Sequence, residues 1–299
     1  MIRHSTAIVA SLLMVAAPLA AQEKRTYGPD SEEHTDVPKG EISQMKFKST
    51  VFAGTERDMW IYVPAQYNRK EPACVMVFQD GGSYVNRKGQ FRVPTVFENL
   101  IHKKKMPVTI GIFISPGVFP DKLTTNKKGE KVPESNRSVE YDTLSPKYAT
   151  MLDKEILPMV GEKYKLRQDA AGRAICGSSS GGICAFTVAW ERPDLFSKVL
   201  SHVGSFTNIR GGDRYPGMIR ATNNKDIRVF LQDGTHDLDN KFGNWWLGNL
   251  QMEAALQYKK YDHKTAWSDG GHNGLHGGSI LAESLVWLWR GEVKAEEKK

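Results

Sequence analysis

Cysteine is scarce in this sequence. Cys74, Cys176 and Cys184 are the only three in 299 residues. An odd number with no framework spacing excludes a scaffold held by disulfide bonds, and it predicts that these residues pack inside the protein. The sequence also has no internal repeat, and its 40% hydrophobic content excludes a disordered chain. We therefore expect a globular protein with a hydrophobic core of its own.

Metal-binding motifs are missing as well. His272 and His276 have the spacing of zinc ligands on a helix, but no glutamate follows the first histidine and Gly274 would interrupt the helix. The stretch that begins at Asp237 starts like a calcium loop, but Phe242 occupies the sixth position, where such loops need glycine. We predict no metal ion and no other cofactor.

Long hydrophobic runs are absent except near the N-terminus. There an apolar run covers residues 7–19, which is shorter than the roughly 20 residues of a membrane-spanning helix and is interrupted by Pro18. A basic start precedes this run, and the small residues Ala20 and Ala21 follow it. The pattern is typical of a secretory signal at residues 1–21, so we predict a periplasmic or secreted protein with no membrane span in its mature form.

Charge of one sign does not gather into a large patch. The formal net charge is +7, and no basic stripe is interleaved with aromatic residues, which argues against a nucleic-acid partner. Residues 22–39 are polar and contain proline and glycine, so they predict an exposed linker. We expect a single domain at residues 40–292 and a charged C-terminal tail at residues 293–299. No feature predicts an oligomeric state.

Segments of strand type alternate with segments of helix type along this domain. The pattern predicts an α/β fold with a mostly parallel central sheet, helices on both faces and an antiparallel pair of strands at the N-terminal edge. The expected strands are 40–50, 57–64, 74–78, 108–115, 174–176, 199–203, 227–231 and 265–267. The expected helices are 147–164, 182–190, 240–258 and 277–289.

The motif G-x-S-x-G follows the strand at 174–176 and precedes a helix. A serine on so sharp a turn needs residues with almost no side chain two positions before it and two after it. Among the three consecutive serines only Ser179 has glycine at both positions, namely Gly177 and Gly181. We therefore predict that Ser179 is a nucleophile on a strand-turn-helix elbow.

A nucleophilic serine needs a histidine base and an acid that orients the histidine. His272 follows two glycines directly after the last strand, and His276 is the alternative. Asp237 is the preferred acid because a few residues separate it from the preceding strand, while Asp233 and Asp239 remain open.

Backbone amides are expected to hold the negative oxygen that forms when serine attacks an acyl group. One donor is the amide of Ser180, which follows the nucleophile at the start of a helix. The second is expected from Gly82 or Gly81, which lie just after the strand at 74–78.

Together these motifs resemble the putative-esterase family of α/β hydrolases, which includes enterochelin esterases, feruloyl and acetylxylan esterases, and esterase D. The resemblance covers about residues 41–290 and is greatest for the enterochelin-esterase-like branch. It rests on V-F-Q-D-G-G, N-R-S-V-E-Y-D, I-C-G-S-S-S-G-G, D-G-T-H-D and G-G-H-N. It implies an α/β-hydrolase fold, a serine esterase, and a catalytic triad of Ser179, Asp237 and His272.

The substrate is expected to be a small-molecule or saccharide ester. The resemblance implies a basic residue for an anionic catecholate, and Arg137 is the nearest candidate; Tyr84, Trp245 and Trp246 are candidates for aryl or sugar platforms. Residues 116–145 show little regular pattern and are expected to cover the mouth of the site. Alternatives are a feruloyl or acetyl carbohydrate esterase, an acyltransferase, and an inactive binding protein on a hydrolase scaffold.

Overall fold

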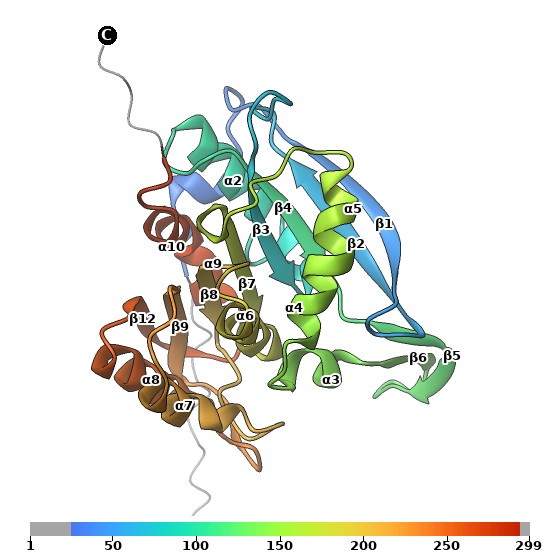
Figure 1. The fold of residues 1–299 in the computed structure, drawn as a ribbon, viewed down its shortest axis with the longest axis vertical. Helices are drawn as coiled ribbons and strands as arrows, with labels where there is room; N and C mark the ends of the chain where they lie inside the picture. Colours follow the sequence, from blue (N-terminus) through green and yellow to red (C-terminus); the bar gives the residue numbers. More distant parts are fainter. Residues whose placement is uncertain (1–24, 294–299) are drawn as a thin grey trace, which may run out of the picture.

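A ten-stranded sheet runs through the centre of the protein (Figure 1). The structure is a computed structural model that describes residues 25–293. The predicted signal at residues 1–21 and all but the first residue of the predicted tail lie outside the described residues. The strands of the sheet are β1 (Glu41–Ser49), β2 (Thr55–Val63), β3 (Cys74–Gln79), β4 (Thr109–Ile114), β5 (Val118–Thr125), β6 (Lys131–Ser135), β7 (Arg173–Ser178), β8 (Lys198–His202), β9 (Arg228–His236) and β12 (Asp262–Gly271).

The central strands are parallel and follow the spatial order β12-β9-β8-β7-β3-β4. On the far side of β4, β2 pairs antiparallel and carries β1 as an antiparallel neighbour. The parallel core, the antiparallel N-terminal edge and the helices on both faces confirm the predicted α/β class. Because parallel strands point the same way, the residues that follow β3, β7, β9 and β12 all emerge at one edge of the sheet.

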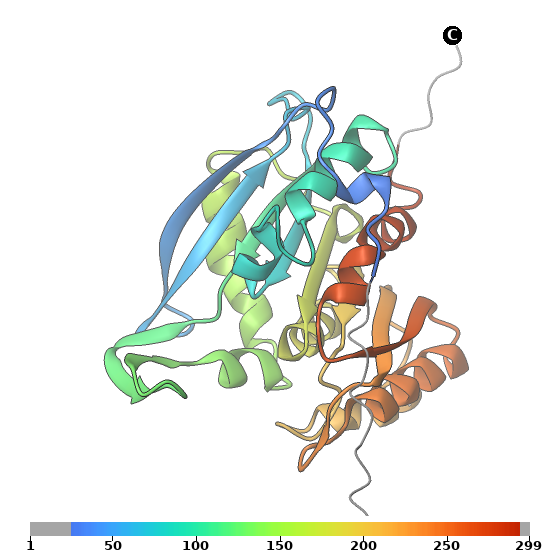
Figure 2. The same ribbon diagram turned by 180° about the vertical axis from the view of Figure 1, so that it is seen from behind.

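Helices cover both faces of the sheet because its central strands are apolar on both sides. Along β3, Cys74, Met76 and Phe78 belong to one cluster of the core, whereas Val75 and Val77 belong to the other. The first face carries α4 (Lys147–Met151), α5 (Leu157–Gly161), α6 (Ser180–Glu191), α7 (Tyr215–Ala221) and α8 (Trp245–Tyr258). The second, nearer the viewer in Figure 2, carries α1 (Gly81–Val85), α2 (Val93–His102), α9 (Leu275–Ser279) and α10 (Leu281–Leu288).

The helix predicted at 147–164 is present but irregular in its middle. A π-helical turn at Leu152–Ile156 joins α4 to α5. Pro158 has no amide hydrogen for an α-helical bond, and the wider turn before it accommodates this loss. The remaining elements are short. They are the 3₁₀ turns Pro29–Ser31, Ala170–Gly172 and Gly212–Arg214, and the strands β10 (Asp239–Asn240) and β11 (Gly243–Asn244).

Residues 116–145 do not form a cover over the site, contrary to our expectation, although Arg137 of this segment lies beside Ser179. They form the hairpin β5–β6 and the helix α3 (Arg137–Asp142), and β5 meets the sheet at the edge of β2. Both views show the hairpin projecting sideways from the sheet (Figures 1 and 2). The two strands were not predicted because they are short and exposed, so apolar and polar residues do not alternate clearly along them.

The described part of the predicted linker, residues 25–39, is attached to the domain rather than free. The side chain of Asn99 on α2 donates hydrogen bonds to the carbonyl oxygens of Asp30 (3.0 Å) and Glu32 (2.8 Å). Ser31 and Val37 are buried. The segment is polar in sequence because many of its side chains face solvent or, like Glu32 with Arg92, form ion pairs beside α2.

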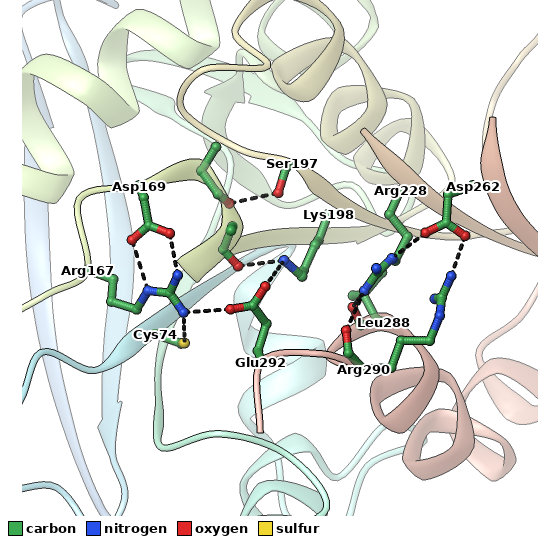
Figure 3. Close-up of polar contacts among 12 residues, drawn as sticks. Cys74, Arg167, Asp169, Ser197, Lys198, Arg228, Asp262, Leu288, Arg290 and Glu292 are labelled. Carbon is green, nitrogen blue, oxygen red and sulfur yellow. Dashed lines mark hydrogen bonds and ion pairs between the residues drawn. The ribbon is translucent and has the colours of Figure 1, made fainter. Parts of the chain in front are cut away.

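A polar network closes the edge of the sheet where the parallel strands begin (Figure 3). Glu292, near the end of the described chain, forms ion pairs with Arg167 (2.7 Å) and Lys198 (3.2 Å). Arg167 also pairs with Asp169, and the Lys198 ammonium donates to the carbonyl oxygen of Ala171. A second cluster beside it contains Arg228, Asp262 and Arg290. The network ties the C-terminal segment to the start of β8.

The three cysteines are free and buried, as predicted. Within residues 25–293, no helix is both long and apolar enough to cross a membrane.

Candidate active site

Ser179 occupies the turn between β7 and α6, where the sequence predicts the elbow. Its backbone has φ 59° and ψ −123°, a conformation that is strained for a residue with a side chain. A Cβ atom on Gly177 would overlap the carbonyl oxygen of Gly181, so the turn closes only with glycine at position 177. The strain places the Ser179 hydroxyl at the edge of the sheet, at the start of a helix.

His272 follows β12 and reaches Ser179 from the neighbouring loop. Its Nε2 atom lies 2.8 Å from Ser179 Oγ, and its Nδ1 atom lies 2.5 Å from Oδ1 of Asp237. If Nδ1 carries the proton and donates to Asp237, Nε2 is free to accept the proton of the Ser179 hydroxyl. The arrangement can therefore turn the hydroxyl into a nucleophile. His276, the alternative, is buried, with Nδ1 next to the side-chain amide of Gln232.

Asp237 lies in the loop after β9 with its carboxylate almost removed from solvent. Burial alone would raise the pKa of Asp237, but hydrogen bonds from His272, from the Asp233 side chain and from the Leu238 amide lower the pKa below its usual value. Asp239, by contrast, is exposed in β10. Of the three aspartates considered, Asp237 is the one that the structure places against His272.

Ser205 is part of this hydrogen-bonded group and was not singled out from the sequence. Its Oγ atom lies 3.2 Å from Ser179 Oγ and accepts the indole N–H of Trp245 at 3.0 Å. The Trp245 ring also meets the His272 ring edge to face at 5.9 Å. Ser205 follows β8, the strand next to β7. Its position after a central strand is the sequence feature that could have identified it as a residue of the site.

The two backbone amides expected as donors both lie in the first turn of a helix. Ser180 is the first residue of α6 and Gly82 the second residue of α1, and amides in a first helical turn have no acceptor within the helix. Gly81 is buried, and a Cβ atom there would overlap the backbone of β4. Gly82 is exposed. Of the two glycines, Gly82 has the more accessible backbone.

A cavity of about 500 Å³ opens beside Ser179 and His272. Its wall is mixed: the rings of Tyr84 and Phe91 lie beside the polar side chains of Asp80, Ser83, Asn86, Gln90 and Arg137. Since serine, asparagine and glutamine donate and accept hydrogen bonds without charge, this wall suits a group rich in hydroxyl or carbonyl oxygens.

Arg137 lies in the wall of the cavity, but its charge is already paired. Its Nε and Nη2 atoms donate to the two carboxylate oxygens of Asp80 at 2.9 and 2.7 Å. Glu140, the acidic residue on the same helix, instead pairs with the buried Arg57. The bidentate pair leaves the wall close to neutral, so the structure does not present Arg137 as a free cation for an anionic substrate.

The aromatic candidates pack rather than offer open rings. Tyr84 touches the cavity but is fully buried, with its ring stacked on Phe91 at 4.1 Å and its hydroxyl 3.0 Å from Nδ1 of His202. Trp245 is buried behind Ser205. Trp246 meets Trp267 edge to face at 5.3 Å and does not line the cavity.

No group of three or more potential metal ligands occurs among residues 25–293.

Comparisons with known proteins agree with the architecture. Residues 49–275 match the family described as Putative esterase. The Iron(III) enterobactin esterase of Escherichia coli O6:H1 is 23% identical over 289 residues, which cover 94% of this chain and 63% of that protein. YbbA, an uncharacterized protein of Bacillus subtilis, is 22% identical over 169 residues, which cover 56% of this chain and 62% of that protein. The chain thus spans a little under two thirds of these curated relatives.

Solved structures show the same fold. The enterochelin esterase of Shigella flexneri superposes with a TM-score of 0.68 at 21% identity, covering 86% of this chain and 60% of that chain. A ferulic acid esterase from Anaeromyces mucronatus gives a TM-score of 0.63 at 18% identity and covers 89% of this chain and 98% of that chain. Because the family match covers more than half of the sequence, the chain belongs to the putative esterase family, and its fold is that of the α/β hydrolases.

Proposed function

We propose that the protein is an exported serine esterase that cleaves a carboxylic ester through the triad Ser179, His272 and Asp237. The observation that carries the proposal is the continuous hydrogen-bonded chain from Asp237 through His272 to the strained Ser179 hydroxyl. Membership of the esterase family supports ester hydrolysis. Export rests on the signal pattern at residues 1–21 alone.

The first half of the reaction forms an acyl-enzyme. Ser179 Oγ attacks the ester carbonyl carbon while its proton passes to Nε2 of His272, and Asp237 stabilises the imidazolium. The carbonyl oxygen becomes negative and faces the amides of Ser180 and Gly82. Collapse of this intermediate breaks the bond to the alcohol oxygen, which leaves with the proton from His272.

The second half releases the acid. Water gives a proton to His272 as its oxygen attacks the acyl-enzyme, and the second tetrahedral intermediate collapses to return Ser179 with its proton. An alcohol in place of water would make the same chemistry an acyl transfer. Product analysis with an added alcohol acceptor separates the two.

We consider two substrate classes, an enterochelin-like ester and a feruloyl or acetyl carbohydrate ester. Two observations favour the carbohydrate ester. Asp80 neutralises Arg137 in the cavity wall, which removes the free cation that an anionic catecholate would need. The match with the ferulic acid esterase spans nearly all of that chain, whereas the match with the enterochelin esterase spans 60% of that chain.

The test of the proposed function is the variant Ser179→Ala, assayed on p-nitrophenyl acetate. We expect the rate to fall at least about 10⁴-fold, because the nucleophile is lost. Ser43→Ala, on the exposed edge strand β1, is the matched control and should retain full activity. A fluorophosphonate probe should label the wild type at Ser179. An absence of labelling together with no turnover would favour the inactive binding protein instead.

A panel of aryl acetates, feruloylated sugars and ferric catecholate trilactones then decides between the substrate classes. We expect the highest kcat/KM on the neutral esters. A clear preference for the trilactone would restore the enterochelin-like assignment.

A further inference from the structure

Asp233 is a buried carboxyl group that the mechanism above does not use. It lies in β9, and its side chain is 0% exposed. Its Oδ1 atom accepts the Gly234 amide N–H at 2.7 Å, and its Oδ2 atom accepts the side-chain N–H of Asn249 at 2.7 Å. Both donors are neutral, and no ion pair to Asp233 is present within residues 25–293. An ionised carboxylate is costly in such surroundings.

The two carboxylate oxygens of Asp237 are unequally satisfied. The hydrogen bonds from His272 Nδ1 and from the Leu238 amide both go to Oδ1. Oδ2 is buried, and within the described residues no N–H group donates to it. The Asp237 amide donates to the carbonyl oxygen of Gly234 (3.1 Å), and this turn brings the Asp233 and Asp237 side chains close enough for each to shift the pKa of the other through a side-chain hydrogen bond. Such a bond requires a proton on one of the two carboxyl groups.

The proton belongs on Asp233 rather than on Asp237. His272 donates to Asp237 and favours its anionic form, whereas Asp233 has only neutral donors. Two touching carboxylates cannot both ionise at low cost, so the pair carries a single negative charge on the member that faces His272.

We propose that Asp233 stays protonated at neutral pH and donates its O–H to Oδ2 of Asp237, so that it acts as a positioning residue for the triad acid. The donated bond keeps the other oxygen of Asp237 directed at His272. The inference rests on the proposed function, because it assigns a partner to the same triad.

The surroundings of Asp233 agree with this assignment. Asp237 and His272 lie on the loop side, and Glu253 lies on α8, the helix whose Asn249 contacts Asp233. His202 on the neighbouring β8 stacks against Tyr84 and Phe91. Burial lowers the pKa of His202 to about 3, so that ring is neutral. Glu253 is held by the side chains of Thr265 and Trp267. Burial first, and then the hydrogen bond and charge of Asp237, raise the pKa of Asp233 to about 9.

The test compares Asp233→Asn with the wild type across pH on p-nitrophenyl acetate. The asparagine amide can still donate to Asp237 but cannot ionise. We expect wild-type kcat to fall above about pH 9 as Asp233 loses its proton, and Asp233→Asn to keep its kcat there. Near neutral pH, kcat of Asp233→Asn should stay within about threefold of the wild-type value. Asp239→Asn, an exposed neighbour, is the matched control and should keep the wild-type profile.

A second variant separates positioning from packing. Asp233→Leu has no donor for Asp237, so kcat should fall about tenfold or more while KM stays within about twofold. Two results would overturn the inference. One is a higher KM with an unchanged kcat in Asp233→Leu, and the other is a fall of kcat at alkaline pH that persists in Asp233→Asn.

Unfolding provides a readout that needs no catalysis. Folding keeps a proton on Asp233 that the unfolded chain releases above about pH 4, so Asp233 should lower the stability of the wild type relative to Asp233→Asn as pH rises from about 4 to about 9. For one proton, the folding equilibrium constant falls tenfold per pH unit, and Asp233→Asn should lack this contribution. Urea titrations of both proteins, each also carrying Ser179→Ala, measure the difference.

The two failures are distinguishable. An active Ser179→Ala variant would refute the proposed function, and the urea titrations would still report on Asp233. Equal pH slopes in the two proteins would refute the inference about Asp233 and leave the serine mechanism in place.

Discussion

At the scale of single residues, the site is defined by how each charge is paired. Asp237 is paired with His272, and Arg137 is paired with Asp80 in the cavity wall. These pairings decide the chemistry more than the residue types do, because a paired guanidinium attracts an anion far less than a free one. The wall of the cavity beside Ser179 is therefore close to neutral.

Asp80→Asn tests this pairing. Asn tolerates the left-handed backbone of this position (φ 53°), so the turn should persist while the Arg137 charge is released. We expect KM for a negatively charged aryl ester to fall about fivefold, which corresponds to about 1 kcal/mol, relative to KM for p-nitrophenyl acetate.

The control for that comparison is the double variant Asp80→Asn/Arg137→Gln, which removes both charges and should return the ratio of the two KM values to the wild-type level. An unchanged ratio in the single variant would show that Arg137 does not face the substrate.

At the scale of elements, the elbow between β7 and α6 is under strong steric constraint. Gly177 and Gly181 touch across the turn, and Gly182 lies against Ser201 of β8 and the backbone of Gly204. The close packing lets a central strand pass directly into a helix, with the Ser179 side chain left at the sheet edge. These contacts on either side hold the Ser179 backbone in its strained conformation.

Gly177→Ala should destabilise the protein by more than about 3 kcal/mol, because the new Cβ atom overlaps backbone that cannot move without opening the turn. Urea unfolding measures the change. Gly161→Ala at the end of α5 is the matched control, since a Cβ atom there meets nothing within 4 Å. It should leave stability unchanged or raise it by up to about 1 kcal/mol. Equal effects at the two positions would contradict the steric account.

At the scale of the whole molecule, the two ends of the parallel strands carry different groups of side chains. The edge where the parallel strands end carries Ser179, Asp237 and His272, and the opposite edge carries the polar network of Figure 3. In that network Glu292 satisfies Lys198, whose side chain is only 4% exposed. The end of the chain thereby stabilises the start of β8 without touching the reacting groups.

Glu292→Ala should lower the free energy of unfolding by about 2 kcal/mol, because it leaves the Lys198 ammonium buried without its carboxylate. Urea titration measures this, and kcat on p-nitrophenyl acetate should be unchanged. Glu283→Ala, at an exposed position of α10, should change neither quantity. A loss of activity in Glu292→Ala at full stability would show that the two edges are coupled.

The parts of this protein that depend on short-range sterics could be predicted from the sequence. Glycine spacing identified Ser179 because a tight turn excludes side chains at fixed positions, and the apolar run of β3 revealed a strand buried on both faces. Those two features, with the alternation of strands and helices, were enough for the α/β fold and for the sheet edge that carries the site.

Only the tertiary structure decided how distant groups meet. It set Asp237 rather than Asp233 or Asp239 against His272, and it paired Arg137 with Asp80, 57 residues away. It also attached residues 25–39 to α2 and turned the β5–β6 hairpin away from the cavity. The reason is physical: local conformation depends on neighbours in the chain, whereas the pairing of charges and the path of exposed segments depend on packing among segments that the sequence keeps far apart.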